Sequence, residues 1–282
     1  MIRFEPLCFC TNNVPGNDIV HALDIAKACG FTYVELSAID GISEQIVAEQ
    51  VCDEYVAQIK SFLDERELIC YAVSGHCSMT DPQQFARLLK KIEFAGKIGA
   101  RFLNTRCGPK QDWDIFEKNV RQAAEAARRW GVQLNLESYG DIVGPAAEAG
   151  TVFDRLQLES IGYNYDTGNN FRFARGQIDM EQDLKHATIV PSALHLKDAS
   201  LADDWINNEA IGDGQLDIPA ILTALEALTP TLPCSLEIPL SFRILCEDLS
   251  FDHLFPSDET VISAVTRSVA YLRKYASFFD NQ

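Results

Sequence analysis

In LNLES (residues 134–138) a short apolar run ends at Glu137, and three later stretches also place a polar residue at the end of such a run. They are IGYNYDTGN (161–169), ALHLKDAS (193–200) and CSLEIP (234–239). The polar residues that end the four runs follow one another at intervals of 29, 29 and 42 residues: Glu137, Asp166, His195 and Glu237. Such intervals are typical of repeated strand and helix units. In a (β/α)₈ barrel the ends of successive parallel strands meet on one face, where that fold places its active site.

The rest of the sequence supplies the segments that such a barrel needs. Short runs rich in Val, Ile, Leu, Tyr or Phe predict eight buried strands, at residues 4–9, 32–36, 68–73, 101–105, 132–137, 161–166, 191–196 and 234–238. Helical patterns lie between them. The clearest begins at Asp81-Pro82, an N-cap followed by proline, and ends at Gly99. Because strands and helices alternate regularly, the sheet is expected to be parallel.

Length and repeat number favour a closed barrel over an open sheet. A chain of 282 residues fits a single barrel of roughly 250 residues with longer loops. A doubly wound open sheet would show the same alternation, but eight units with polar strand ends beyond the fourth favour closure. The expected fold is therefore α/β: a single (β/α)₈ TIM barrel domain over residues 1–282, with parallel strands and the active site at their C-terminal face.

Two connections on the expected active-site side are longer than the fold requires. They are residues 199–216, after the seventh strand, and residues 239–257, after the eighth. Long loops at this face of a barrel usually cover a substrate. The second connection also carries several aromatic residues, which suits either a lid or a contact with another subunit. The sequence leaves these two roles open, and with them a homodimer or a homotetramer.

Composition excludes some classes of partner. The formal net charge of −17 opposes binding to phosphate backbones, so nucleic acid is not an expected partner. No stretch approaches the ~20 uninterrupted apolar residues of a membrane span, and the first residues lack the pattern of a signal peptide. We therefore expect a cytoplasmic protein that acts on small molecules and not at a membrane.

The four strand-end residues have the chemistry of a metal site. Three carboxylates and one imidazole suit a divalent cation, with water or substrate completing its shell. Taken singly, a carboxylate at a strand end is more often solvated or ion-paired, and a lone histidine is more often a hydrogen-bonded core residue. Their matching position in four consecutive units favours one shared site, formed by Glu137, Asp166, His195 and Glu237.

Other polar residues near strand ends are candidates for substrate binding. His76 follows the third strand and Arg106 the fourth; the alternatives are a buried hydrogen-bonding histidine and a surface arginine. Lys197, two residues after His195, could polarise a substrate oxygen or pair with a carboxylate. At Glu35, which ends the second strand, we expect a structural ion-pair partner and not a ligand.

These motifs resemble those of the xylose isomerase-like TIM barrels. This superfamily includes ketose 3-epimerases, hydroxypyruvate isomerase, inosose isomerases and dehydratases, 3-dehydroshikimate dehydratase and endonuclease IV. The resemblance spans nearly the whole chain. It rests on GFTYVEL (30–36), the LxLE that ends at Glu137, YDTGN (165–169), HLKD (195–198), GDGQLD (212–217) and SLEIP (235–239).

The resemblance implies a metal-dependent sugar isomerase or epimerase. In that branch the residues matching Glu137, Asp166, His195 and Glu237 bind one divalent metal, commonly Mn²⁺, Mg²⁺ or Co²⁺, with Zn²⁺ as a further alternative. The two glutamates also act as acid and base on opposite faces of the substrate. A metal that chelates a ketone oxygen and its neighbouring hydroxyl stabilises the enediolate formed when a proton leaves carbon. The implied substrate is a sugar, a sugar phosphate or a keto-polyol.

Departures from the family patterns keep other reactions open. Asn169 stands where many members have a histidine, so an amide replaces a candidate substrate contact. Ser138 and Tyr139 follow Glu137, so the second-position histidine of the dehydroshikimate dehydratase branch is absent. The main alternative is a metal-dependent dehydratase of an inosose or a keto-acid, and a second is a non-catalytic sugar-binding barrel. A chain with five histidines and a strong negative charge does not suit the three-metal nuclease.

Overall fold

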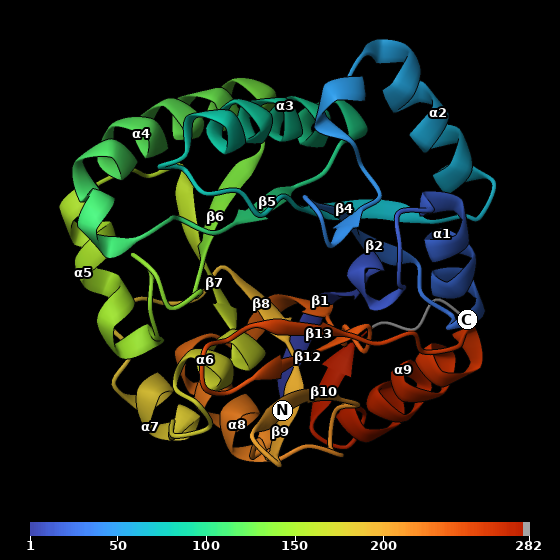
Figure 1. Ribbon diagram of the computed structural model, residues 1–282, viewed down its shortest axis with the longest axis vertical. Helices are drawn as coiled ribbons and strands as arrows, with labels where there is room; N and C mark the ends of the chain where they lie inside the picture. Colours follow the sequence, from blue (N-terminus) through green and yellow to red (C-terminus); the bar gives the residue numbers. More distant parts are fainter. Residues whose placement is uncertain (279–282) are drawn as a thin grey trace.

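Eight parallel strands form a closed barrel at the centre of the molecule. The structure is a computed structural model and describes residues 1–278. β1 pairs with β2 on one side and with β11 on the other, which closes the ring and confirms the expected TIM barrel (Figure 1). The barrel strands are β1 (Ile2–Cys10), β2 (Tyr33–Ile39), β4 (Ile69–Ser74), β5 (Phe102–Thr105), β6 (Gln133–Glu137), β7 (Ile161–Asp166), β8 (Ala193–Leu196) and β11 (Thr231–Leu236).

Helices surround the barrel on its outside, and at least one follows each barrel strand (Figure 1). They are α1 (Ile19–Ala28), α2 (Asp53–Asp64), α3 (Pro82–Ile98), α4 (Trp113–Trp130), α5 (Ala146–Leu156), α6 (Thr167–Phe173), α7 (Met180–Lys185), α8 (Ile218–Leu228) and α9 (Asp258–Leu272). Within residues 1–278, none of the helices combines the length and the apolar composition that a membrane crossing requires.

Local sequence determines where the predicted helix α3 begins and ends. The side chain of Asp81 accepts hydrogen bonds from the backbone N–H groups of Gln83 (2.9 Å) and Gln84 (2.8 Å), which caps the first turn. The helix ends at Gly99, whose φ of +91° is the left-handed conformation that glycine adopts without strain. Both ends agree with the expectation from the sequence.

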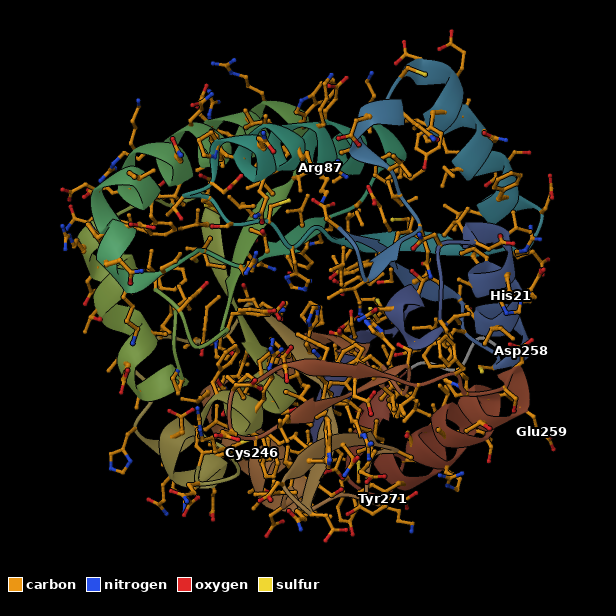
Figure 2. The ribbon with its side chains drawn as sticks, viewed as in Figure 1. His21, Arg87, Cys246, Asp258, Glu259 and Tyr271 are labelled. Atoms are coloured by element: carbon orange, nitrogen blue, oxygen red, sulfur yellow. The ribbon has the colours of Figure 1, made fainter. Side chains whose placement is uncertain are left out.

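The first and last parts of the chain meet on the outside of the barrel. Nε2 of His21, on α1, lies 3.0 Å from Oδ1 of Asp258, at the start of α9 (Figure 2). The short strand β14 (Ala276–Phe278) pairs in parallel with β1. A second short strand, β3 (Ser43–Glu44), pairs with β2. The first and last units therefore contact each other both through helices and through strands.

The eighth barrel strand begins and ends earlier than the sequence predicts. It spans Thr231–Leu236 instead of residues 234–238, so Glu237 directly follows the strand. The strand includes Pro233, although proline cannot donate to a strand ladder. The register between β1 and β11 shifts between Phe4 and Leu7, so Pro6 and Pro233 lie together at an irregularity where regular pairing is interrupted.

A second, antiparallel sheet lies over one end of the barrel. Its strands are β9 (Asp198–Ala202), β10 (Trp205–Glu209), β12 (Phe242–Leu245) and β13 (Phe251–His253). They fall within the two connections that the sequence predicts as long loops. β10 pairs with both β9 and β12, so the two connections form a single cover (Figure 1). Ile206, Phe242, Ile244 and Phe251 of this cover line the pocket at the barrel mouth, and a subunit contact stays a prediction.

Candidate active site

The four strand-end residues meet at the mouth of the barrel. Nδ1 of His195 lies 2.9 Å from Oε2 of Glu237, 3.1 Å from Oε2 of Glu137 and 3.7 Å from Oδ2 of Asp166. All four side chains are buried. They converge because β6, β7, β8 and β11 are consecutive parallel strands, whose C-terminal ends lie at the same edge of the barrel.

Two atoms at the centre of this group lack hydrogen bonds. Nδ1 of His195 and Oε2 of Glu237 have no hydrogen-bond partner within residues 1–278, although only 2.9 Å separates them. Buried polar atoms are nearly always hydrogen-bonded, and a bound ion is a common reason for an exception. One imidazole nitrogen that faces three carboxylates is a donor set that suits a divalent cation. The ligand atoms of Asp166, His195 and Glu237 lie close enough together to share one.

Glu35 contacts the other side of the His195 ring. Nε2 of His195 lies 3.0 and 3.1 Å from the two carboxylate oxygens of Glu35, and Asn104 donates to the same carboxylate at 2.9 Å. Ser235 donates to it as well. Burial opposes ionisation of Glu35, but His195 and Ser235 lower its pKa. A carboxylate in this position orients a metal-ligating histidine and fixes its tautomer. Glu35 is an ion-pair partner, as expected, and the pair supports the candidate metal centre.

Lys197 pairs with two of the central carboxylates. Its Nζ lies 2.9 Å from Oδ2 of Asp166 and 3.1 Å from Oε1 of Glu237. Burial opposes ionisation of both acids, but attraction to Lys197 and His195 lowers the pKa of Asp166 and holds that of Glu237 well below its usual range. Burial also disfavours a charged lysine, yet Asp166 and Glu237 raise its pKa. This ion-paired arrangement keeps Glu237 ionised at neutral pH.

Glu137 has different surroundings from Glu237. Its Oε1 accepts a hydrogen bond from the side chain of Asn169 at 2.7 Å, and its Oε2 accepts one from Asn164 at 3.0 Å. Burial raises the pKa of Glu137 to about 8, against the lowering effect of His195. Two nearby carboxylates whose pKa values are driven apart by their surroundings are suited to act as an acid and a base.

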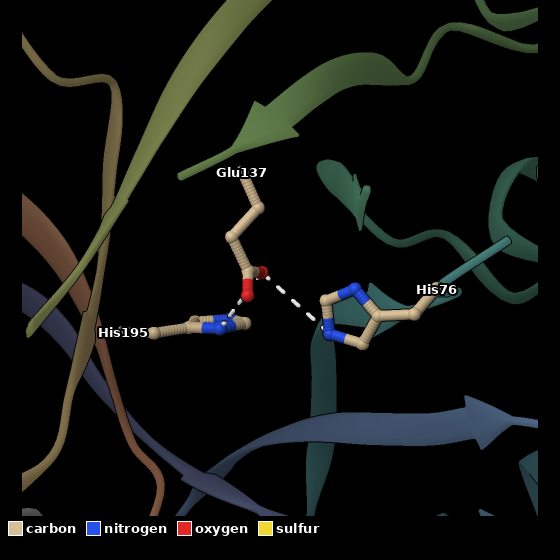
Figure 3. Close-up of side chains that lie close together, drawn as sticks. All are labelled: His76, Glu137 and His195. Carbon is tan, nitrogen blue, oxygen red and sulfur yellow. Dashed lines mark ion pairs between the residues drawn. The ribbon is translucent and has the colours of Figure 1, made fainter. Parts of the chain in front are cut away.

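His76 lies on the far side of Glu137. Its Nε2 is 3.6 Å from Oε2 of Glu137, so this carboxylate lies between the rings of His76 and His195 (Figure 3). Burial lowers the pKa of His76 to about 3, which keeps the ring neutral. Nδ1 of His76 has no hydrogen-bond partner in the described part of the chain, and the side chain lines the mouth pocket. A neutral imidazole in this position could hydrogen-bond a ligand.

The remaining candidates occupy different positions. The side chain of Asn169 donates to Asp166 at 2.9 Å as well as to Glu137, so it holds two carboxylates in place at the pocket wall. The guanidinium of Arg106 donates to Gln84 at 3.0 Å, and Arg106 does not line the mouth pocket. Asn12, which the sequence analysis missed, donates to Oε1 of Glu237 at 2.9 Å. It follows the first strand, so the strand-end rule could have identified it.

The pocket at the barrel mouth joins the strand-end residues to the antiparallel cover. It is open to solvent, and its lining comes from strand ends, from α6 and from the cover. Polar residues from strand ends and α6 form one part of its lining: Asn12, His76, Glu137, Asn169, Arg172, Lys197 and Glu237. Apolar residues of the cover form much of the rest. The pocket thus combines polar strand-end residues with an apolar roof.

Several solved structures share this fold. D-allulose 3-epimerase from Methylomonas sp. is 15% identical with a TM-score of 0.69, over 98% of this chain and 99% of that one. The IOLI protein with a binding zinc atom is 16% identical with a TM-score of 0.71, over 97% of this chain and 100% of that one. A xylose isomerase-like TIM barrel protein from Mycobacterium smegmatis in complex with magnesium is 17% identical with a TM-score of 0.67, over 94% of this chain and 97% of that one. At these identities the likeness is one of fold, and no curated protein sequence matches the chain.

A family match adds to the structural likeness. The xylose isomerase-like TIM barrel family matches residues 23–250, which is most of the chain. This range contains Glu35 and the strand-end residues Glu137, Asp166, His195 and Glu237. The resemblance of the sequence motifs and the closed barrel agree with this match. The chain therefore belongs to the xylose isomerase-like TIM barrel family.

Proposed function

We propose that this protein is a divalent-metal-dependent isomerase or epimerase of a small sugar or keto-polyol. The observation that carries the proposal is the pair of buried, unpartnered atoms, Nδ1 of His195 and Oε2 of Glu237, among three carboxylates. Sugar epimerases among the structural neighbours support the substrate class.

Four residues would hold the metal. Glu137, Asp166 and Glu237 offer carboxylate oxygens and His195 offers Nδ1, while Glu35 orients the imidazole from behind. This donor set suits Mg²⁺, Mn²⁺, Co²⁺ or Zn²⁺. When bound, such an ion supplies a Lewis acid that stabilises negative charge on a substrate oxygen.

The two glutamates would move the proton. Glu237, which is ion-paired with Lys197, is the base that takes a proton from the carbon beside the substrate carbonyl. Glu137, which is hydrogen-bonded to two amides, is the acid that returns a proton to carbon from the other side of the pocket. Removal from one face and return to the other inverts the carbon, which is an epimerisation. Both glutamates then need proton exchange with solvent before the next turnover.

Solvent exchange tests this mechanism. The Mn²⁺-loaded protein incubated with a panel of ketoses in deuterated water should place deuterium on the reacting carbon of any ketose that it converts. Glu137→Gln and Glu237→Gln should each reduce turnover at least ~100-fold, the usual loss for a general acid or base. A product without solvent label would indicate a hydride shift instead of proton transfer. Conversion of the substrate to a product that has lost one water would favour the dehydratase. Full activity in both glutamine variants would exclude the proposed roles.

A further inference from the structure

Arg172 is a buried cation in the wall of the mouth pocket. It lies on α6 and its exposed fraction is only 8%. Nε is buried without a hydrogen-bond partner, and across residues 1–278 the guanidinium makes no ion pair or hydrogen bond. Arginine stays charged in proteins, and its guanidinium carries five N–H donors. A charge that is largely removed from water is destabilising unless something pairs with it.

Aromatic rings surround Arg172 but cannot satisfy its donors. The guanidinium carbon lies 4.7 Å from the ring centroid of Phe251, 4.8 Å from that of Phe173 and 5.8 Å from that of Tyr139. Ring faces attract a cation. They do not replace the oxygen acceptors that a guanidinium prefers, which are those of carboxylates and phosphates. The rings therefore form a cage that holds the cation ready for an anion.

Arg172 lies one helical turn from the reaction centre. Asn169 and Arg172 are three residues apart on α6, so their side chains lie on the same face of the helix, about 5–6 Å apart at Cβ. Asn169 donates to Glu137 and Asp166, and both Asn169 and Arg172 line the mouth pocket. Arg172 and Glu137 therefore line the same pocket and are linked through Asn169.

The other cations near the mouth already have partners. Lys197 pairs with Asp166 and Glu237, and Arg243 pairs with Asp252 at 2.8 Å. Arg106, as described above, is bonded to Gln84 and lies outside the pocket lining. Within the described range, Arg172 is thus the pocket-lining lysine or arginine that has no acceptor.

We propose that Arg172 binds an anionic group of the substrate, a carboxylate or a phosphate. The substrate would be a keto sugar acid or a phosphorylated ketose, with its carbonyl end at Glu137 and Glu237 and its anionic end at the guanidinium. A planar guanidinium can bind either anion through two parallel hydrogen bonds. This inference rests on the proposed function, because it extends the same pocket from the reacting carbon to the far end of the ligand.

Matched ligands test the anion site without requiring turnover. Calorimetric titration of the Mn²⁺-loaded protein would compare D-fructose with D-fructose 6-phosphate and with D-fructuronate, the corresponding keto-uronate. We expect at least one anionic ketose to bind about tenfold or more tightly than fructose, which corresponds to about 1.4 kcal/mol. Arg172→Met, which keeps an apolar side chain of similar length among the rings, should abolish this preference and change the affinity for fructose by less than about threefold. The anion that binds more tightly identifies carboxylate or phosphate.

Arg243→Met is the matched control, because it removes a partly exposed arginine that is paired with Asp252 and stacked on Trp205. It should keep the preference. If Arg172→Met fails to fold, Arg172→Lys retains the charge without the guanidinium fork and should lose most of the preference. No preference in the wild-type protein, or equal losses for neutral and anionic ketoses in Arg172→Met, would overturn the inference. Anion-selective binding without deuterium exchange would uphold the anion site and reject the proposed reaction instead.

Discussion

The negative charge of Glu35 is expected to strengthen a metal bound through His195. Nε2 of His195 lies 3.0 Å from Oε1 and 3.1 Å from Oε2 of Glu35. Asn104 also donates to Oε1, and Ser235, a hydroxyl that can also act as an acceptor, donates to Oε2. In Glu35→Gln the amide oxygen can occupy the first position and the amide nitrogen the second. The substitution therefore removes the charge and keeps the hydrogen bonds from His195 and Asn104 at the first position, although the contact of His195 with the second position is lost.

Two separate arguments give the size of the effect. A hydrogen bond to a charged group contributes about 1.5–3 kcal/mol and a neutral one about 0.5–1.5 kcal/mol, so the change weakens the support of His195 by roughly 1–1.5 kcal/mol. Changing the hydrogen-bond partner of a metal-ligating histidine typically lowers metal affinity about 10- to 100-fold. The two ranges meet near tenfold, or about 1.4 kcal/mol. We therefore expect Glu35→Gln to bind Mn²⁺ about tenfold more weakly than the wild-type protein.

Competition against a chelating dye at fixed pH and ionic strength would measure the Mn²⁺ affinity. Thermal melting of the metal-free proteins would show that the variants remain folded. Ser235→Ala is the control, because it removes one hydrogen bond from Glu35 and retains its charge, so its effect should stay below about threefold. An affinity of folded Glu35→Gln within about twofold of the wild-type value would refute the reasoning, since the charge would then not reach the metal through His195.

Two other substitutions test the candidate site. His195→Ala should prevent stoichiometric binding of a divalent ion, because it removes the imidazole ligand. Elemental analysis of the protein after reloading with metal and dialysis measures the bound ion. One equivalent of metal retained by the variant would contradict the ligand assignment. Gly168→Ala would place a Cβ 2.7 Å from Cβ and 2.6 Å from Cδ of Lys197, so we expect overpacking of about 1–3 kcal/mol and a lower melting temperature. Gly144→Ala is its matched control, since that Cβ would approach Glu148 no closer than 3.5 Å, and equal melting temperatures of the two variants would argue against the clash.

The barrel and the centre of the site could be predicted because both depend on local periodicity. Apolar runs that end in Glu137, Asp166 and His195 mark the C-terminal ends of successive strands, and parallel pairing brings such ends to one edge. Alternation of side chains along a strand places Asn164 on the same side as Asp166. In the structure, Asn164 indeed faces into the site and donates to Glu137.

Contacts between residues distant in sequence could not be predicted in the same way. Glu35 and His195 are 160 residues apart, and neither segment carries a local signal that names the other as its partner. The sequence predicted the cover as loops, because its strands are short and β10 is largely polar. In addition, β10 pairs with β12, which lies beyond the next barrel strand in the sequence. Arg172 was missed since an arginine in a helical segment is most often exposed.

The number of buried charges at the barrel mouth explains why this centre suits a divalent cation. Glu35, Glu137, Asp166 and Glu237 are all buried, and together they would carry four negative charges when ionised. Lys197 offsets one of them and a divalent ion would offset two, with His195 neutral as a ligand. One negative charge remains, and a proton on one carboxylate would offset it. Glu137 is a candidate for that proton, because amides and not the lysine contact it, and in the absence of an ion burial raises its pKa to about 8. The acid role proposed for Glu137 and the divalent ion proposed for the site would therefore both reduce the same excess of negative charge.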